Sequence, residues 1–180
     1  MFDTVRGQTL YFFIDVKTSG PETFKAVIVA LEPLRQKEYL TTLKDEVTFR
    51  NGPITVIGTG NTPLSMVAPV MDRDYFFDAR LDKLGDLKYK GITSLISPIA
   101  STSFKWAVGS VNDTDPVLNV EQMRGLRMQI ATAKSRGIGA RFRNTPSYPI
   151  STRNLVWRTL LHEGVKLLNT DDLDAVTRYF

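Results

Sequence analysis

The chain has 180 residues, of which 42% are hydrophobic and 23% are charged, a balance that is typical of one globular domain and excludes a disordered chain. The formal charge of +4 permits an anionic ligand without requiring nucleic acid, and the absence of cysteine excludes disulfides and thiolate chemistry within these residues. No run of about 18 apolar residues is present, so the sequence predicts no transmembrane segment.

Short apolar runs at intervals typical of βα units predict six β-strands. They are Leu10–Val16, Ile54–Gly58, Tyr75–Asp78, Thr93–Ile96, Ile138–Phe142 and Val165–Asn169. Residues 97–118 are predicted as a long irregular loop, of the kind that often lies over a binding site.

Helix signals occupy the intervals between these strands. Pro21 suits the first position of a helix that Pro33 should end or kink. Asn119 and Gln122 have the spacing of a capping box, and Gly137 suits the other end of that helix. Two further helices are expected, one from Ser151 to Glu163 and one that begins after Thr170-Asp171-Asp172, with Pro63 opening a short helix after the second strand.

Strands that are apolar on both faces and alternate with helices predict a parallel sheet. Two architectures have this pattern, a doubly wound open sheet and a (β/α)8 barrel, and we expect one domain over residues 1–180. Both architectures gather functional groups where the strands end, so the strand ends are the places to look for a site.

Asp15 and Lys17 come at the end of the first strand, two residues apart. One interpretation makes Asp15 a ligand for a hard divalent cation or a charge that orients a base, with Lys17 neutralising a phosphate. A Schiff-base role for Lys17 ranks below that. The alternative is a structural salt bridge between the two side chains.

The next strand ends in a glycine turn over residues 58–63, which lacks the spacing of a nucleotide-binding loop and is interpreted as an ordinary tight turn. Arg141 and Arg143 share one face of a later strand. Two guanidiniums in that position need an anionic ligand or acidic side chains as partners. At the end of the last strand, Asp171 or Asn169 is the candidate site residue. Asp78, at the end of the predicted strand Tyr75–Asp78, is a weaker candidate of the same kind. His162, the only histidine, is predicted near the C-terminal end of a helix, on the wrong side for catalysis.

Taken together and in order, five segments resemble the fungal altered-inheritance-of-mitochondria protein 6 family, which belongs with phosphatidylinositol-phospholipase-like and glycerophosphodiester phosphodiesterases. The segments are residues 12–20, 58–63 and 75–79, Arg141-Phe142 with Thr145-Pro146, and residues 168–173. The resemblance implies a TIM-type (β/α)8 barrel that cleaves a phosphodiester with two histidines and a divalent cation, Mg²⁺ or Ca²⁺. It assigns Asp15 to the metal, and Lys17 and Asp171 to the substrate, a phosphodiester or phospholipid-derived small molecule. From their shared strand face we add Arg141 and Arg143 as substrate-binding candidates, although the family often has a tryptophan at about the place of Arg143.

In such enzymes the histidines lie on the first two strands, whereas this chain matches about strands three to eight. We therefore expect a C-terminal fragment of a phosphoric diester hydrolase of lipid metabolism, inactive by itself, with the strand of Asp15 at an open edge. Any mitochondrial or secretory targeting would come from a preceding segment. The alternative is a non-catalytic anion-binding or interaction protein on the same scaffold. The basic stretch from Asn119 to Leu160 lacks an aromatic platform, so nucleic acid is not expected as a partner.

Overall fold

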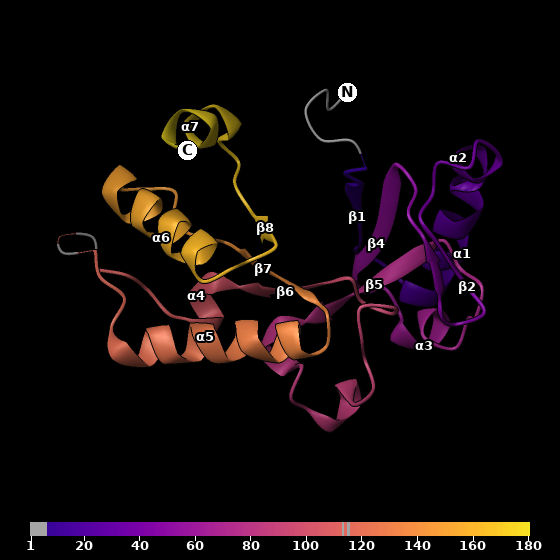
Figure 1. Ribbon diagram of the computed structural model, residues 1–180, viewed down its shortest axis with the longest axis horizontal. Coiled ribbons are helices and arrows are strands. Elements are labelled where there is room, and N and C mark those ends of the chain that lie inside the picture. The colour runs from indigo at the N-terminus through magenta and orange to yellow at the C-terminus, as the bar shows by residue number, and fades with distance from the viewer. Residues whose placement is uncertain (1–6, 113, 115) are drawn as a thin grey trace. The chain divides into compact units, whose positions relative to one another are not determined.

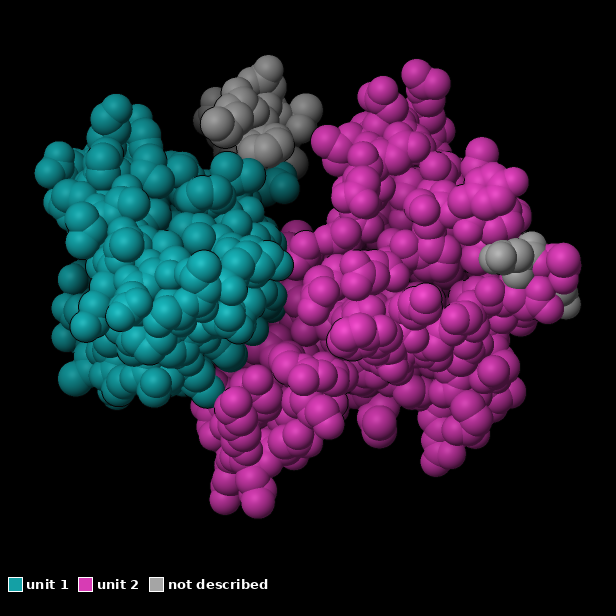
Figure 2. Space-filling model, turned by 180° about the vertical axis from the view of Figure 1, so that it is seen from behind, with its two compact units in different colours: residues 1–78, 95–98 teal, residues 79–94, 99–180 magenta. Residues whose placement is uncertain are grey.

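A computed structural model of the chain describes residues 7–112, 114 and 116–180. They form an α/β structure in which helices alternate with parallel strands (Figure 1). The chain divides into two compact units, which Figure 2 shows in different colours. Unit 1 comprises residues 1–78 and 95–98, and unit 2 comprises residues 79–94 and 99–180.

Unit 1 is built on parallel strands in the order β1 (Leu10–Val16), β4 (Ile54–Gly60) and β5 (Tyr75–Arg80), the last of which continues into unit 2. Neighbouring β5 residues face opposite ways, as a strand requires. Tyr75 meets Phe24 with ring centroids 5.2 Å apart, and Phe76 meets Phe49 at 5.4 Å. The sheet therefore carries a helix on one face and a small hairpin on the other. These elements are α1 (Gly20–Ala30) and the hairpin of β2 (Thr42–Lys44) and β3 (Thr48–Arg50).

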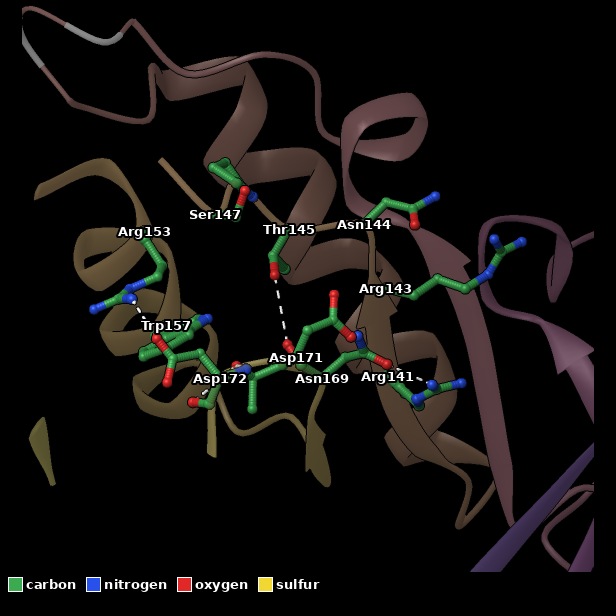
Figure 3. A pocket seen from close by; sticks show the side chains of 12 residues that line it. Arg141, Arg143, Asn144, Thr145, Ser147, Arg153, Trp157, Asn169, Asp171 and Asp172 are labelled. Carbon is green, nitrogen blue, oxygen red and sulfur yellow. Dashed lines mark hydrogen bonds and ion pairs between the residues drawn. The ribbon is translucent and has the colours of Figure 1, made fainter. Parts of the chain in front are cut away.

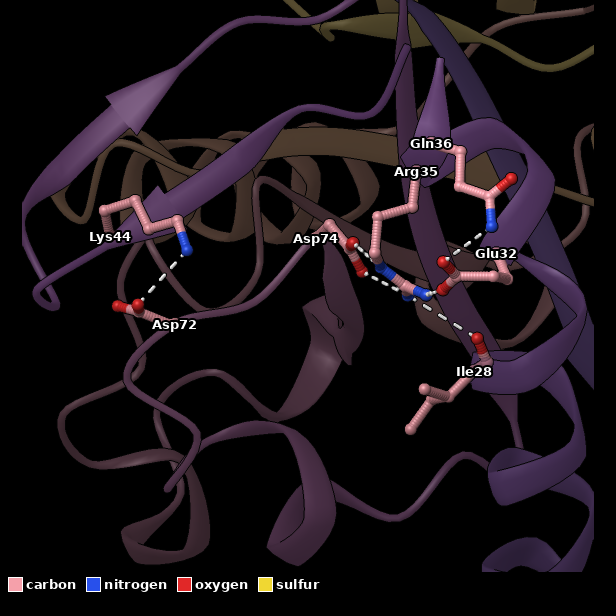
Figure 4. A network of polar contacts seen from close by, with 7 residues as sticks. All are labelled: Ile28, Glu32, Arg35, Gln36, Lys44, Asp72 and Asp74. Carbon is pink, nitrogen blue, oxygen red and sulfur yellow. Dashed lines mark hydrogen bonds and ion pairs between the residues drawn. The ribbon is translucent and has the colours of Figure 1, made fainter. Parts of the chain in front are cut away.

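The break expected at Pro33 is confirmed. Helix α1 ends at Ala30, and α2 (Glu32–Gln36) begins with Pro33 in its first turn. The new helix places Arg35 against Asp74, with Nε 2.5 Å from Oδ2 and a second guanidinium nitrogen 3.0 Å from Oδ1 (Figure 4). The side chain of Asp74 is only 10% exposed, so this two-point pair neutralises a nearly buried carboxylate at the start of β5. Hydrogen bonds from the guanidinium to Asp74 raise the pKa of Arg35 further above its ordinary value.

Unit 2 contains parallel strands in the order β6 (Ile99–Ser103), β7 (Gly139–Arg143) and β8 (Leu167–Leu168). The expected capping box begins α5, since Asn119 Oδ1 and Gln122 Oε1 each accept a backbone N–H of the other residue at 2.9 Å. The helices of this unit are α4 (Phe104–Ala107), α5 (Val120–Ser135), α6 (Ile150–His162) and α7 (Leu173–Tyr179), with short 3-10 turns η1 (Leu81–Lys83) and η2 (Leu87–Tyr89). Its most buried large side chains include Phe104, Leu126, Phe142 and Trp157.

The strand predicted over Thr93–Ile96 is wrong, because residues 94–96 form a turn and β6 lies at Ile99–Ser103. The segment expected to be an irregular loop therefore supplies a strand and α4. All five residues of β6 are buried, although three of them carry hydroxyl groups. Partners satisfy these groups: Thr102 donates to Asp82, while Ser101 and Ser103 accept from Arg141 and Asn144.

Smaller differences concern the ends of elements. Pro63 is the N-cap of α3 (Leu64–Val67) rather than its first helical residue, and β8 covers only two of the five residues expected at Val165–Asn169. Within the described residues no helix combines the length and apolar character needed to cross a membrane.

Candidate functional site

Asp15 and Lys17 form an ion pair at the end of β1, with Oδ2 and Nζ 2.5 Å apart. Lys17 lies one residue beyond the strand. Their side chains are 45% and 78% exposed, so water screens the pair and it contributes little to stability. The salt bridge that the sequence suggested therefore exists, in a position where solutes also reach it.

The glycine turn at the end of β4 packs tightly against this pair. Gly60 has a φ of 65°, and a Cβ there would lie 2.3 Å from Asp15 Oδ1. Asn61 Nδ2 donates to the carbonyl oxygens of Lys17 and Thr18 at 3.3 and 3.1 Å. A Cβ at Gly20 would lie 2.3 Å from the Asn61 carbonyl oxygen. Close packing of two loops therefore explains these glycines, as expected for an ordinary tight turn.

The residues around Asp15 do not by themselves fit a divalent cation. Mg²⁺ and Ca²⁺ take about six or more oxygen ligands, several of them from carboxylates or water. Among the described residues no three His, Asp or Glu side chains lie close enough to share a metal ion. The carboxylate of Asp15 is also in contact with the ammonium of Lys17. A cation at this place would have to displace Lys17 and find further ligands.

A second group of predicted residues comes together in unit 2. A pocket of about 340 Å³ lies beyond the ends of β7 and β8, and Arg141, Arg143 and Asp171 all line it (Figure 3). The carboxyl ends of parallel strands meet at one edge of a sheet, which is why Asp171 converges with the two arginines that precede it by 28 and 30 residues. Asp15, Lys17 and the weaker candidate Asp78 belong to unit 1 instead.

The two arginines are held differently. Arg141 donates to Asn169 Oδ1 and, at 3.4 Å, to Ser101 Oγ, so one neighbour just beyond β8 and one on β6 fix its guanidinium. Arg143 is exposed at the last position of β7, and its guanidinium has no partner within the described part of the chain. The Asp171 carboxylate is exposed and likewise without a partner among those residues. This side of the pocket thus presents one fixed cation, Arg141, one available cation, Arg143, and one available anion, Asp171.

The opposite wall of the pocket consists of Arg153, Trp157 and Asp172. Arg153 lies over the Trp157 ring, with 4.5 Å between its guanidinium carbon and the ring centroid, and forms an ion pair with Asp172 at 3.2 Å. Asp172 also caps α7 by accepting the Ala175 N–H at 2.9 Å. The expected helix start at Thr170-Asp171-Asp172 is therefore confirmed. Because Asp172 is the cap, Asp171 remains available to the pocket.

His162 is the last residue of α6, and its side chain is 82% exposed beside Glu163. This agrees with the expectation that it lies away from the strand ends. The sequence analysis singled out neither Arg153 nor Trp157. The signal that was present is their spacing of four residues, which places the two side chains on one face of a helix.

The fold and the pocket define an α/β protein of parallel strands with a polar pocket at the strand ends. The family described as AIM6-like phosphodiesterase domain matches residues 1–78. An altered inheritance of mitochondria protein 6 homolog from Arthroderma benhamiae is 50% identical over 181 residues, which cover 100% of this chain and 56% of that protein.

Proteins named altered inheritance of mitochondria protein 6 from Eremothecium gossypii and Lachancea thermotolerans are each 30% identical. These matches cover 96% and 94% of this chain, and 46% and 44% of the two relatives. The matches confirm that the chain is related to the fungal altered-inheritance-of-mitochondria protein 6 family. It spans about half the length of the curated relatives it matches. No solved structure gave a significant match.

Proposed function

We propose that the chain is the phosphate-binding part of a phosphoric diester hydrolase that acts on phospholipid-derived diesters, built as strands three to eight of a TIM-type barrel. The observation that carries this proposal is the convergence of Arg141, Arg143 and Asp171 on one pocket beyond β7 and β8. The relation to a family described as phosphodiesterase-like supports the same conclusion.

In this proposal the available guanidinium of Arg143 binds two oxygens of the phosphate, for which its planar donors are suited. Arg141, fixed by Asn169 and Ser101, adds a positive charge whose position does not depend on the ligand. Asp171 accepts a hydrogen bond from the alcohol part. Lys17 serves the same class of ligand in unit 1 by neutralising a phosphoryl oxygen.

The chain by itself binds and does not hydrolyse in this proposal. General acid and base work on a phosphodiester calls for groups that give and take a proton near neutral pH, most often histidines. The sequence has one histidine, His162, at the far end of α6. We propose Asp15 as one ligand of a Mg²⁺ or Ca²⁺ ion only together with ligands from outside the described residues, because its surroundings here do not form such a site.

A second candidate is a non-catalytic anion-binding or interaction protein on the same scaffold. The ion pair between Asp15 and Lys17 favours it, since a carboxylate engaged by an ammonium is not free to hold a metal. Both candidates share the anion pocket and differ in whether the complete protein turns the diester over.

Titration calorimetry with inorganic phosphate and with dimethyl phosphate tests the shared part of the proposal. The substitution Arg143→Ala should weaken binding about tenfold, the loss expected for one charge-assisted hydrogen-bonded contact. Arg124→Ala is the matched control, because Arg124 is an exposed arginine on α5, outside the pocket, and its removal changes the net charge equally. Equal affinities of the two variants would contradict the proposal.

A further inference from the structure

The segment that follows β5 carries an exposed leucine among basic side chains. Residues 81–94 run through η1 and η2 and lie wholly within unit 2. Leu87 is 87% exposed, more than any other large hydrophobic side chain among the described residues, and Lys88 and Lys90 beside it are exposed as well. One exposed leucine is ordinary on a protein surface, but an apolar side chain in a basic setting has a specific kind of partner.

The segment is anchored to the end of α5. Tyr89 is buried, and its carbonyl oxygen accepts a hydrogen bond from NH1 of Arg136, the C-cap residue of α5, at 2.7 Å. The N–H of Ser94 donates to the Arg136 carbonyl oxygen at 3.2 Å. Leu84 and Ile92 are also buried, so the segment is fixed at both ends. In Figure 1 it lies below the end of α5.

The positive charge of this surface is not neutralised within the described residues. Lys83 lies 3.9 Å from Asp86, a weak pair between exposed groups. Lys88, Lys90 and Arg136 have no acidic partner in the part of the chain that the structure describes. These three cations and Leu87 form what we call the basic surface.

The composition of the basic surface favours a lipid membrane over other anionic partners. Single-stranded nucleic acid binds where bases can stack on exposed aromatic rings, and Tyr89 is only 5% exposed. An acidic polypeptide would neutralise the lysines but gives Leu87 no apolar environment. A bilayer with anionic headgroups meets both requirements, because lysines bind the headgroups while an apolar side chain reaches the acyl boundary.

We propose that the basic surface binds an anionic phospholipid membrane, with Leu87 inserted between the headgroups and Lys88, Lys90 and Arg136 bound to their phosphates. None of these four residues lines the pocket of unit 2. The proposal therefore goes beyond the proposed function and does not depend on it. It assigns to the segment between β5 and β6 the task of holding the chain at a membrane.

Flotation of the chain with lipid vesicles tests the role of charge. We expect binding to vesicles in which phosphatidylserine replaces part of the phosphatidylcholine, no binding to phosphatidylcholine alone, and weaker binding as salt is added. Changing both Lys88→Gln and Lys90→Gln should weaken binding about 25-fold, since each lysine at an anionic surface contributes a factor of about five. The matched control changes Lys25→Gln and Lys37→Gln, two exposed lysines of unit 1, and should have little effect.

A fluorescent label at position 87 tests insertion. The chain has no cysteine, so Leu87→Cys provides one site for the environment-sensitive fluorophore NBD, at an exposed position where the change should not disturb the fold. We expect its emission to increase and to shift to shorter wavelength with phosphatidylserine vesicles. The control is the same label at Val47→Cys, where the native side chain is 72% exposed in unit 1, and its emission should not change.

Four results would overturn the proposal. They are no binding to phosphatidylserine vesicles, equal losses in the two double variants, an unchanged emission at position 87 in bound protein, and binding to polyglutamate in place of vesicles, which would assign the surface to an acidic protein.

The variant Arg143→Ala separates this proposal from the proposed function. It should bind phosphatidylserine vesicles as wild type does, even though we expect it to bind soluble phosphate more weakly. Loss of vesicle binding in Arg143→Ala would place the lipid contact at the pocket and contradict the basic surface. If soluble phosphate does not bind but vesicles do, the proposed function fails and the basic surface stands.

Discussion

Asp82 in η1 is a charged residue whose pKa depends on its hydrogen-bond partners. Its carboxylate accepts hydrogen bonds from Arg80, with 2.6 Å between the closest atoms, and from Thr102 Oγ1 on β6 at 3.0 Å. Burial alone would raise the pKa of Asp82, but these hydrogen bonds outweigh it and hold the pKa below its ordinary value of 3.8. The ionised carboxylate therefore ties η1 to a strand whose other polar groups are also buried.

The substitution Asp82→Asn should lower the free energy of unfolding by roughly 1 kcal/mol at pH 7. Because the pKa is lower in the folded chain, the unfolded chain binds more protons in the acid range, and this stabilisation disappears as the pH falls through the folded pKa. Urea unfolding at pH 7, 5 and 2.5 should thus show a constant difference between wild type and variant down to about pH 5 and a reduced one at pH 2.5. Asp86→Asn, at an exposed pair with Lys83, is the control and should have little effect. A difference that does not decrease in acid would contradict this account.

Individual residues also show what the sequence predicts about the site. Arg141, Arg143 and Asp171 follow from the rule that parallel strands gather polar groups where they end, and the pocket brings all three together. Trp157 does not follow from any pattern, because a tryptophan between Val156 and Leu160 on a helix has the appearance of core and is indeed buried. Only the packing reveals that its N–H has no hydrogen-bond partner among the residues that the structure describes.

At the scale of elements, apolar and capped segments are predictable and polar buried ones are not. The run Leu10–Val16 and the capping box at Asn119 agree with β1 and α5. The sequence does not predict β6 because three of its five buried residues carry hydroxyl groups, whose partners come from distant residues such as Arg141 and Asp82. The sequence does not predict the hairpin of β2 and β3, because each strand has only three residues.

Gly60, the last residue of β4, allows a test of whether close packing or ligand binding explains the glycine at this position. Gly60→Ala would place a Cβ 2.3 Å from Asp15 Oδ1 and 2.5 Å from the Val16 carbonyl oxygen, at a φ of 65°. We expect a loss of about 2 kcal/mol or more in the free energy of unfolding without any ligand present. Gly85→Ala is the matched control, since a Cβ at Gly85 meets nothing within 4 Å, and it should be neutral or slightly stabilising. Equal effects of the two changes in chemical denaturation would show that close packing does not explain the glycine.

At the scale of the whole molecule, the described chain has an exposed sheet edge. Within the described residues β1 pairs only with β4, and its side chains Leu10 and Phe12 are 40% and 44% exposed. This agrees with the expectation that the strand of Asp15 lies at an open edge. Unpaired edges with apolar side chains favour association with other strands.

Phe12→Lys should therefore reduce self-association of the isolated chain, because a charge on an edge strand opposes pairing with another edge. Light scattering across a concentration series measures this, with thermal unfolding as a check on the fold. Val29→Lys serves as the control, since Val29 is 73% exposed on α1 and does not belong to the edge. If both variants reduced self-association equally, the added charge would explain the effect and the edge strand would not.

We propose that the isolated chain binds phosphate esters and does not cleave them. An assay of the isolated chain with glycerophosphocholine and Mg²⁺ or Ca²⁺, read by release of the alcohol, tests it most directly, with calorimetry on the same sample to establish binding. We expect binding that depends on Arg143 and no turnover above the uncatalysed reaction. Turnover that Asp15→Ala abolishes would contradict it.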